Sequence, residues 1–199
     1  MSAIGPLNEP LVLASSSPRR AEILTSVGWP FRAVAAGIDE TRRSAETPVE
    51  YVQRLALEKA QAVASSLESG LVLGADTTVV VEGNLLGQPV DNDDARRMLR
   101  LLSGGWHEVL TGVAIVKIAG STRVEYERTR VRFAEMSEAE IDWYISTGEP
   151  QGKAGAYAVQ GCAALFIDEL EGDYFNVVGL PVRLVFEMVK EMTEKERSD

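Results

Sequence analysis

The sequence predicts an α/β fold, because short runs of apolar residues alternate along the chain with amphipathic segments. The runs Leu11–Ala14, Leu71–Gly74 and Val79–Val81 have the length and composition of buried strands. The longest uninterrupted apolar run, Cys162 to Ile167, is far shorter than the roughly 20 residues of a membrane-spanning helix. The pattern therefore excludes a membrane protein.

Helix-start signals precede the main amphipathic segments. Two of them are capping boxes, in which a Ser or Thr and the Glu three residues later satisfy each other's backbone amides: Thr47 with Glu50, and Ser137 with Glu140. They predict helices over about 48–68 and 138–147. A third helix is expected to follow Asp91 and stop at Gly104, and a fourth to begin at Pro181.

The length and the absence of linkers favour one compact unit. A chain of 199 residues can bury one sizeable core, and it shows no repeat and no low-complexity tract. Residues 112–133 have the pattern of two strands that turn at Ala119-Gly120-Ser121. We therefore expect a single domain over residues 1–199, with residues 194–199 as a frayed polar tail.

Charge and cysteine content exclude several functional classes. The 20 basic and 30 acidic residues leave a formal charge of −10, which disfavours duplex nucleic acid as a partner but not a small anion. A single cysteine, Cys162, and a single histidine, His107, cannot make an internal disulfide or a zinc site of four Cys or His ligands. Residues 1–10 lack the pattern of a secretory signal, so a cytoplasmic location is expected.

The segment from Leu11 to Arg20 predicts an anion site between a strand and a helix. A serine loop follows the buried strand, and Ser17 and Pro18 suit the cap and first position of a helix, whose exposed amides attract phosphate. Arg19 and Arg20 lie in the first turn, where a bound polyanion would offset their unfavourable interaction with the helix dipole. A capped helix with two solvated arginines explains the pattern equally well. The Walker pattern of P-loop enzymes does not occur.

Acidic residues supply the second candidate group. Asp76 follows an apolar strand and two small residues, and ligands of α/β folds gather at strand ends. At such a place Asp76 could bind a divalent cation or take a proton from water, or it could simply begin a turn. Asp39 and Glu40 could share the metal, and a solvated loop explains that pair equally well.

Two lysines are candidates for phosphate binding. Lys59 falls on the same helical stripe as Val52 and Ala60, so its ammonium group either snorkels to the edge of that face or points into a cleft. Lys153 lies in a glycine-rich turn that lets the backbone approach a ligand, although a flexible surface loop is the alternative. The single histidine, His107, favours a structural role over a catalytic one.

Taken in order, six groups of residues resemble the Maf family over nearly the whole chain. They are Ala14-Ser15-Ser16-Ser17-Pro18-Arg19-Arg20, Leu73-Gly74-Ala75-Asp76-Thr77, Leu102-Ser103-Gly104 through Thr111-Gly112-Val113, Gly148-Glu149-Pro150 through Lys153-Ala154-Gly155-Ala156-Tyr157, Gln160-Gly161, and Val178-Gly179-Leu180-Pro181. The resemblance implies a house-cleaning enzyme that hydrolyses nucleoside triphosphates to monophosphate and pyrophosphate. It further implies an elongated mixed sheet flanked by helices, as in Maf and ITPase-like proteins, with a central cleft between two lobes. Dependence on a divalent cation, Mg²⁺ or Mn²⁺, and a homodimer are also implied.

The resemblance also assigns roles to individual residues. Asp76 matches the proton acceptor of the family. Arg19, Thr77 and Gln160 match positions linked to substrate choice in the branch that acts on dTTP and UTP, which we prefer over the branch that acts on 7-methyl-GTP. The other matched positions are expected to hold phosphates or, with Asp76, the metal: Ser15, Lys59, and Asp39 or Glu40. Arg20 and Lys153 add positive charge.

Two departures from the family pattern bear on activity. Gln88 stands where the family usually has a phosphate-binding lysine, and Gly152 stands where an aspartate commonly precedes the lysine. Losing one charged hydrogen bond costs about 1.5 to 3 kcal/mol, so we expect retained catalysis with unusual kinetics. One alternative is a regulatory nucleotide-binding module of septum formation with weak or no turnover. Another is a phosphatase that acts on simple esters.

Overall fold

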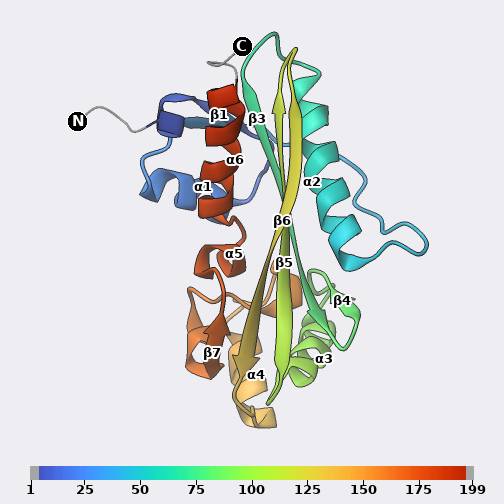
Figure 1. Cartoon of the computed structure of the whole chain (residues 1–199). Coiled ribbons are helices and arrows are strands. Elements are labelled where there is room, and N and C mark those ends of the chain that lie inside the picture. The colour runs from blue at the N-terminus through green and yellow to red at the C-terminus, as the bar shows by residue number, and fades with distance from the viewer. Residues whose placement is uncertain (1–4, 196–199) are drawn as a thin grey trace. The chain divides into compact units, whose positions relative to one another are not determined.

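The computed structural model describes residues 5–195 and shows a mixed α/β protein (Figure 1). Its strands are β1 (Leu11–Leu13), β2 (Phe31–Ala33), β3 (Leu71–Val81), β4 (Asn84–Leu86), β5 (Trp106–Lys117), β6 (Thr122–Phe133) and β7 (Ile167–Glu171). They form a seven-stranded sheet in the order β2-β1-β3-β5-β6-β7, with β4 paired to β3. β1 is parallel to β2 and β3, whereas β4 and β7 are antiparallel to their neighbours. The expected mixed α/β class is confirmed.

Helices flank the sheet. The α-helices are α1 (Pro18–Ser26), α2 (Pro48–Ala64), α3 (Asn92–Leu102), α4 (Glu138–Ser146), α5 (Tyr174–Val178) and α6 (Val182–Lys195). The 3-10 helices are η1 (Gly5–Asn8), η2 (Ala154–Ala156) and η3 (Cys162–Phe166). Within residues 5–195, no helix has both the length and the apolar character that crossing a membrane requires.

The predicted helix starts are confirmed, and one predicted end is wrong. Both capping boxes are formed, at the starts of α2 and α4, and Asp91 caps α3. However, α2 ends at Ala64 and not near residue 68. The hydroxyl groups of Ser65 and Ser66 donate to the carbonyl oxygens of Ala62 and Val63, so these serines end the helix by competing for its last backbone acceptors.

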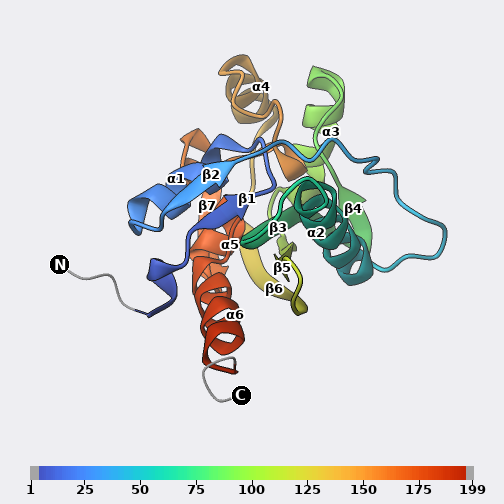
Figure 2. The same ribbon diagram turned by 90° about the horizontal axis from the view of Figure 1, so that it is seen from above.

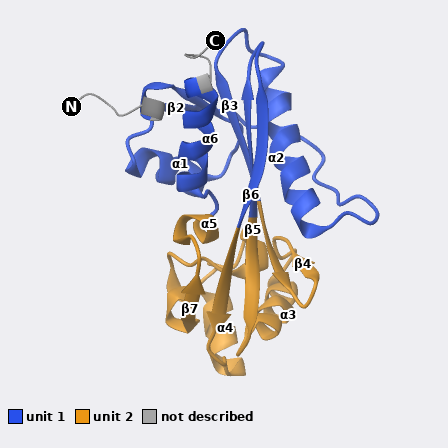
Figure 3. Ribbon diagram, viewed as in Figure 1, with its two compact units in different colours: residues 1–76, 111–127, 179–199 blue, residues 77–110, 128–178 orange. Residues whose placement is uncertain are grey.

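The chain divides into two compact units (Figure 3). Unit 1 takes in the described residues of 1–76, 111–127 and 179–199, and unit 2 takes in 77–110 and 128–178. β3, β5 and β6 contribute residues to both units, whereas β1 and β2 belong to unit 1 and β4 and β7 to unit 2. A single domain over 1–199 stays a prediction.

Unit 1 packs helices against both faces of its strands. Figures 1 and 2 show α2 on one side of β3 and β5, and α6 on the other. Small and β-branched residues line the contact with α2: Val12, Ala14, Ala56, Ala60, Val63, Val72 and Ala114. The backbone of α2 therefore lies close to the sheet.

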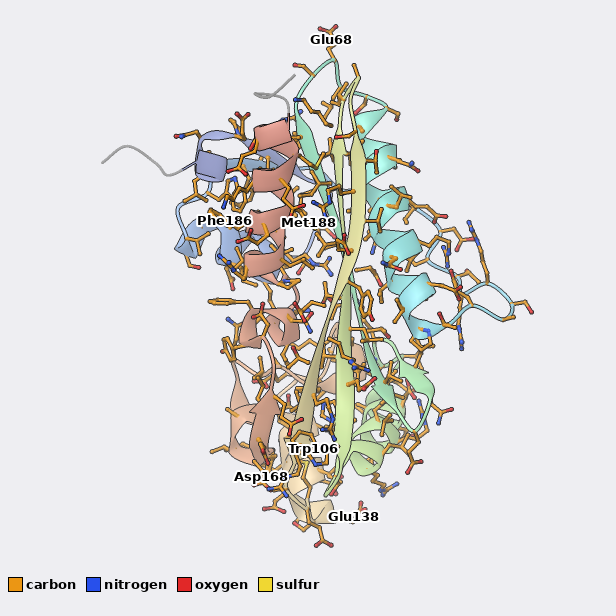
Figure 4. All side chains as sticks on the ribbon, in the orientation of Figure 1. Glu68, Trp106, Glu138, Asp168, Phe186 and Met188 are labelled. Atoms are coloured by element: carbon orange, nitrogen blue, oxygen red, sulfur yellow. The ribbon has the colours of Figure 1, made fainter. Side chains whose placement is uncertain are left out.

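The helix α6 carries a buried apolar face and extends further than expected. Val185, Met188, Val189 and Met192 are buried. Figure 4 labels Phe186 and Met188 on this helix, and the ring of Phe186 meets that of Trp29 edge to face at 6.4 Å. Residues 194 and 195 of the predicted tail belong to α6, and residues 196–199 lie outside the described residues.

Unit 2 has its own core, which includes the single histidine. The His107 ring lies edge to face against Phe133 and Tyr157, and its Nε2 is 2.8 Å from the Tyr157 hydroxyl oxygen. Burial lowers the pKa of His107 to about 4, so the imidazole is neutral at physiological pH. The burial and the ring contacts of His107 agree with the structural role predicted for it.

Two glycines allow the close approach of α2. A Cβ atom added at Gly74 would overlap the carbonyl oxygen of Ala56, and one added at Gly112 would overlap that of Val52. In both cases the obstacle is helix backbone, which cannot move aside as a side chain can. Glycine at these two positions of β3 and β5 therefore sets the distance between the sheet and α2.

We predict that Gly74→Ala lowers the free energy of unfolding by about 2 kcal/mol or more, since overpacking a core typically costs about 1 to 3 kcal/mol. Gly87→Ala is the matched control, because nothing lies within 4 Å of a Cβ added there. Urea unfolding should separate the two variants. Equal stability of Gly74→Ala and Gly87→Ala would contradict the close approach of α2.

Candidate functional site

Asp76 lies in the middle of a strand. The sequence predicts a strand end or a turn at this position, and both predictions are wrong, because residues 71–81 form one continuous strand, β3. Ala75 is small, and Thr77 and Thr78 are β-branched, so the chain stays extended through this stretch. The carboxylate is therefore held by the sheet itself, which is more rigid than a loop.

The partner of Asp76 is Lys59 on α2. The Lys59 Nζ donates to Asp76 Oδ1 at 2.6 Å. The two side chains are only 11% and 10% exposed, so both charges are largely removed from water. Lys59 lies on the buried stripe of α2 with Val52 and Ala60, as predicted. The snorkelling alternative is wrong, since the ammonium group points to a buried carboxylate.

The serine loop brings a second buried cation to unit 1. The Arg20 Nη1 donates to Ser15 Oγ at 3.1 Å, and its Nε donates to the carbonyl oxygen of Gly179 at 2.8 Å. Ser15 and Arg20 are each 8% exposed, whereas Arg19 is half-buried. The alternative that the sequence allowed, a capped helix with two solvated arginines, is therefore wrong for Arg20. Ser17 occupies the cap position of α1 before Pro18, but its side chain makes no capping hydrogen bond.

Burial and neighbouring charges shift the pKa values of Asp76 and Arg20 in opposite directions. Burial raises the pKa of Asp76, and the charges of Lys59 and Arg20 oppose this rise. Burial likewise lowers the pKa of Arg20, which the charge of Asp76 opposes. Burial also lowers the pKa of Arg19. A carboxylate with a raised pKa is a stronger base than an exposed one, which suits proton abstraction from water.

The two acids of the loop before α2 differ in their contacts. Glu40 Oε1 is 2.8 Å from Lys59 Nζ, and its side chain is 55% exposed. The Asp39 carboxylate accepts from the backbone amide of Thr41 at 2.9 Å, and hydrogen bonding to Thr41 lowers its pKa. The structure thus brings Glu40, rather than Asp39, to the ion pair of Lys59 and Asp76.

The acids of this group fit a cation bound with few protein ligands. In the described part of the chain, no three His, Cys, Asp or Glu side chains gather into a metal-binding group. However, Mg²⁺ usually keeps several waters and binds one or two carboxylates together with substrate phosphates. Asp76 and Glu40 converge on one ammonium group, so two carboxylates already face a positive charge at this place.

The remaining predicted residues belong to unit 2. Thr77 directly follows Asp76 in β3 and is half-buried, while Gln88 and Gln160 are exposed. The Gly155 amide donates to the Gly87 carbonyl oxygen at 3.0 Å, which brings the turn of Lys153 beside the segment of Gln88. Lys153 is half-buried, and its Nζ donates to the carbonyl oxygen of Gln151 at 3.3 Å.

The departure at Gly152 coincides with a left-handed backbone conformation. Its φ of 70° lies in the left-handed region, which glycine adopts far more readily than an aspartate. No comparable backbone reason distinguishes Gln88, which follows Gly87 on the surface.

Two residues of α2 that the sequence does not point to, Tyr51 and Arg54, contact the loop before this helix. The Tyr51 hydroxyl donates to the carbonyl oxygen of Glu40 at 3.0 Å. The Arg54 guanidinium binds the Glu46 carboxylate through Nε at 2.6 Å and through Nη2 at 2.9 Å. Neither residue stands out in the sequence, because a tyrosine and an arginine near a helix start also suit an ordinary solvated face.

Comparison with known proteins agrees with this architecture. The family model described as Maf-like protein matches residues 10–192. A dTTP/UTP pyrophosphatase of Pelotomaculum thermopropionicum is 54% identical over 181 residues, which cover 90% of this chain and 95% of the relative. One of Symbiobacterium thermophilum is 51% identical over 179 residues, covering 90% and 92%. The Ham1 protein of Staphylococcus aureus has a similar fold, with a TM-score of 0.53 at 13% identity over 92% of this chain and 99% of that one.

We predict strong energetic coupling between Lys59 and Asp76. Removing one partner of a buried ion pair typically costs about 3 to 5 kcal/mol, so Lys59→Met should destabilise the protein by about that amount at pH 7. Adding Asp76→Asn to Lys59→Met should recover part of the loss, because the Asp76 carboxylate is then no longer buried without the ammonium group of Lys59. Urea unfolding of the four proteins of this cycle measures the coupling, and additive effects would show that the pair is not formed.

Proposed function

The chain belongs to the Maf-like protein family, and on that premise we propose that it hydrolyses nucleoside triphosphates, dTTP and UTP above others, to monophosphate and pyrophosphate. The observation that carries this proposal is the buried group of unit 1, in which Asp76 meets Lys59 near the serine loop. Relatives that are about half identical over nine tenths of this chain are dTTP/UTP pyrophosphatases, which supports the substrate choice.

In this proposal unit 1 binds phosphate. The Ser15 hydroxyl, Arg19 and Lys59 supply hydrogen-bond donors and positive charge. Arg20 already donates to Ser15 and Gly179, so its first effect is to hold the serine loop in shape. Among the residues of unit 2, Lys153 and Gln88 are proposed to bind phosphate, and Thr77 and Gln160 to select the base.

We propose that Asp76 and Glu40, with Asp39 beside them, hold a divalent cation, Mg²⁺ or Mn²⁺. Such a cation would neutralise phosphate charge and lower the pKa of water. Asp76 Oδ1 accepts from Lys59, so the lysine fixes the orientation of the carboxylate. Substrate phosphates would compete with the carboxylates for the ammonium group of Lys59.

Asp76 is proposed as the base that orients or deprotonates the water that attacks the α-phosphorus. A base acts only when ionised, so the rate should fall as the pH falls through the pKa of Asp76. That pKa is raised by burial, which places the fall above the ordinary value of about 3.9. A cytoplasmic location and a homodimer stay predictions.

The proposal predicts that purified protein with Mg²⁺ or Mn²⁺ releases pyrophosphate faster from dTTP and UTP than from CTP, GTP or 7-methyl-GTP. Asp76→Asn should lower turnover by about 10² to 10⁴-fold, the usual contribution of a general base. Asp93→Asn is the matched control, since its side chain is 94% exposed and pairs with Arg96 on the surface.

Pyrophosphate and orthophosphate are scored separately. Orthophosphate release from simple esters would replace the proposal with a phosphatase. Nucleotide binding without turnover at any metal concentration would instead indicate a regulatory nucleotide-binding module. It would also attribute the lack of turnover to Gln88, which stands where the family usually has a phosphate-binding lysine.

A further inference from the structure

The loop between β2 and α2 carries Glu40, and side chains of α2 bind this loop along its length. Residues 40–46 have no regular hydrogen-bonded secondary structure. Nevertheless Glu40 must meet Lys59 with its carboxylate, and a loop free to move would hold it there only part of the time. The contacts that fix the loop therefore bear on the proposed metal site.

Arg54 makes the most extensive of these contacts. Its guanidinium binds both carboxylate oxygens of Glu46, at 2.6 and 2.9 Å, and its Nη2 also donates to the carbonyl oxygen of Thr41 at 3.3 Å. A third nitrogen, Nη1, binds Glu58 one turn further along α2 at 3.1 Å. Arg54 thus links both ends of the loop to the helix.

This pairing is not an ordinary surface ion pair. The side chains of Arg54 and Glu46 are only 12% and 8% exposed, and the two-point geometry uses the planar shape of the guanidinium, which lysine lacks. Most exposed pairs contribute about 0 to 1 kcal/mol, whereas a shielded two-point pair holds its partners in one arrangement.

Tyr51 and the capping box complete the attachment. The Tyr51 hydroxyl donates to the backbone carbonyl oxygen of Glu40 at 3.0 Å, and the Arg54 guanidinium carbon lies 5.6 Å from the centre of the Tyr51 ring. Thr47 and Glu50 cap the start of α2 where the loop enters it. The backbone of Glu40 is therefore held by the same helix that carries Lys59.

We propose that Arg54 is a positioning residue that fixes the loop of residues 40–46, so that the Glu40 carboxylate stays beside Lys59 and Asp76 and a divalent cation binds there with higher affinity. The proposal rests on the proposed function for the role of the metal. Arg54 has no contact with the cation in this scheme and acts through Glu40.

Arg54→Lys tests this, because it keeps the charge and removes the two-point geometry. The affinity for Mn²⁺ alone, measured from the electron paramagnetic resonance signal of free Mn²⁺, should fall by about 10-fold or more, the range for losing a charged hydrogen bond. Arg43→Lys is the matched control on the same loop, since the Arg43 side chain is 66% exposed and pairs with Glu58, and it should bind Mn²⁺ as the unmodified protein does.

A second experiment tests whether Arg54 affects the metal affinity by positioning Glu40. In a Glu40→Gln background, Arg54→Lys should weaken Mn²⁺ binding by less than 2-fold. At saturating metal, kcat should stay close to that of the unmodified protein while the metal concentration for half-maximal rate rises. If Arg54→Lys does not fold, Tyr51→Phe removes one hydrogen bond from the loop and should weaken Mn²⁺ binding by about 3-fold.

Several results would overturn the proposal: unchanged Mn²⁺ affinity in Arg54→Lys, the same loss in Arg43→Lys, or a full loss in the Glu40→Gln background. Absence of Mn²⁺ binding by the unmodified protein would also overturn it. Because binding of Mn²⁺ needs no turnover, an unmodified protein that binds Mn²⁺ but releases no pyrophosphate would refute the proposed function alone.

Discussion

The buried ion pair of Lys59 and Asp76 is the interaction on which the arrangement of unit 1 depends. Two charges that are only 11% and 10% exposed stabilise the fold only when they meet at hydrogen-bond distance, because removing a charge from water costs several kcal/mol. They meet at 2.6 Å because α2 lies close to β3. That approach in turn needs glycine at positions 74 and 112, where any Cβ would overlap the backbone of the helix. Two residues without side chains thus make the charged pair attainable.

The same pair explains why the buried charged side chains Arg20, Lys59 and Asp76 lie together in unit 1. Asp76 raises the pKa of Arg20 against the effect of burial, and Arg20 and Lys59 lower that of Asp76 against the same effect. Burying the Asp76 carboxylate therefore lowers the free-energy cost of burying Arg20, and the two cations lower the cost of burying Asp76. The buried group of unit 2, around His107 and Tyr157, contains a neutral imidazole instead. Among the residues described, the two units thus bury polar groups in different ways, and the charged group is the one suited to phosphate and water chemistry.

The sequence predicted the features that depend on neighbours within a helical turn or a strand. The capping boxes of α2 and α4, the stripe that carries Lys59 and the mixed α/β class are confirmed.

The predictions that were wrong or missing concern contacts between residues far apart in the sequence. Asp76 was expected at a strand end, because small residues around it resemble a turn, but pairing with other strands keeps β3 extended. Arg20 binds a carbonyl oxygen 159 residues away, and nothing local distinguishes it from Arg19. Arg54 and Tyr51 were missed because the loop they hold has no periodic pattern.

Asp76, with Glu40 beside it, is the proposed centre that receives a cation and the triphosphate. A crystal structure with Mn²⁺ and a non-hydrolysable dTTP analogue would test this assignment, because anomalous scattering locates manganese without assumptions about its ligands. We expect a manganese peak within coordination distance of Asp76 and Glu40, with Lys59 turned towards a phosphate oxygen. A peak remote from both carboxylates, with the hydrogen bond between Lys59 and Asp76 intact and the phosphates bound elsewhere, would contradict it.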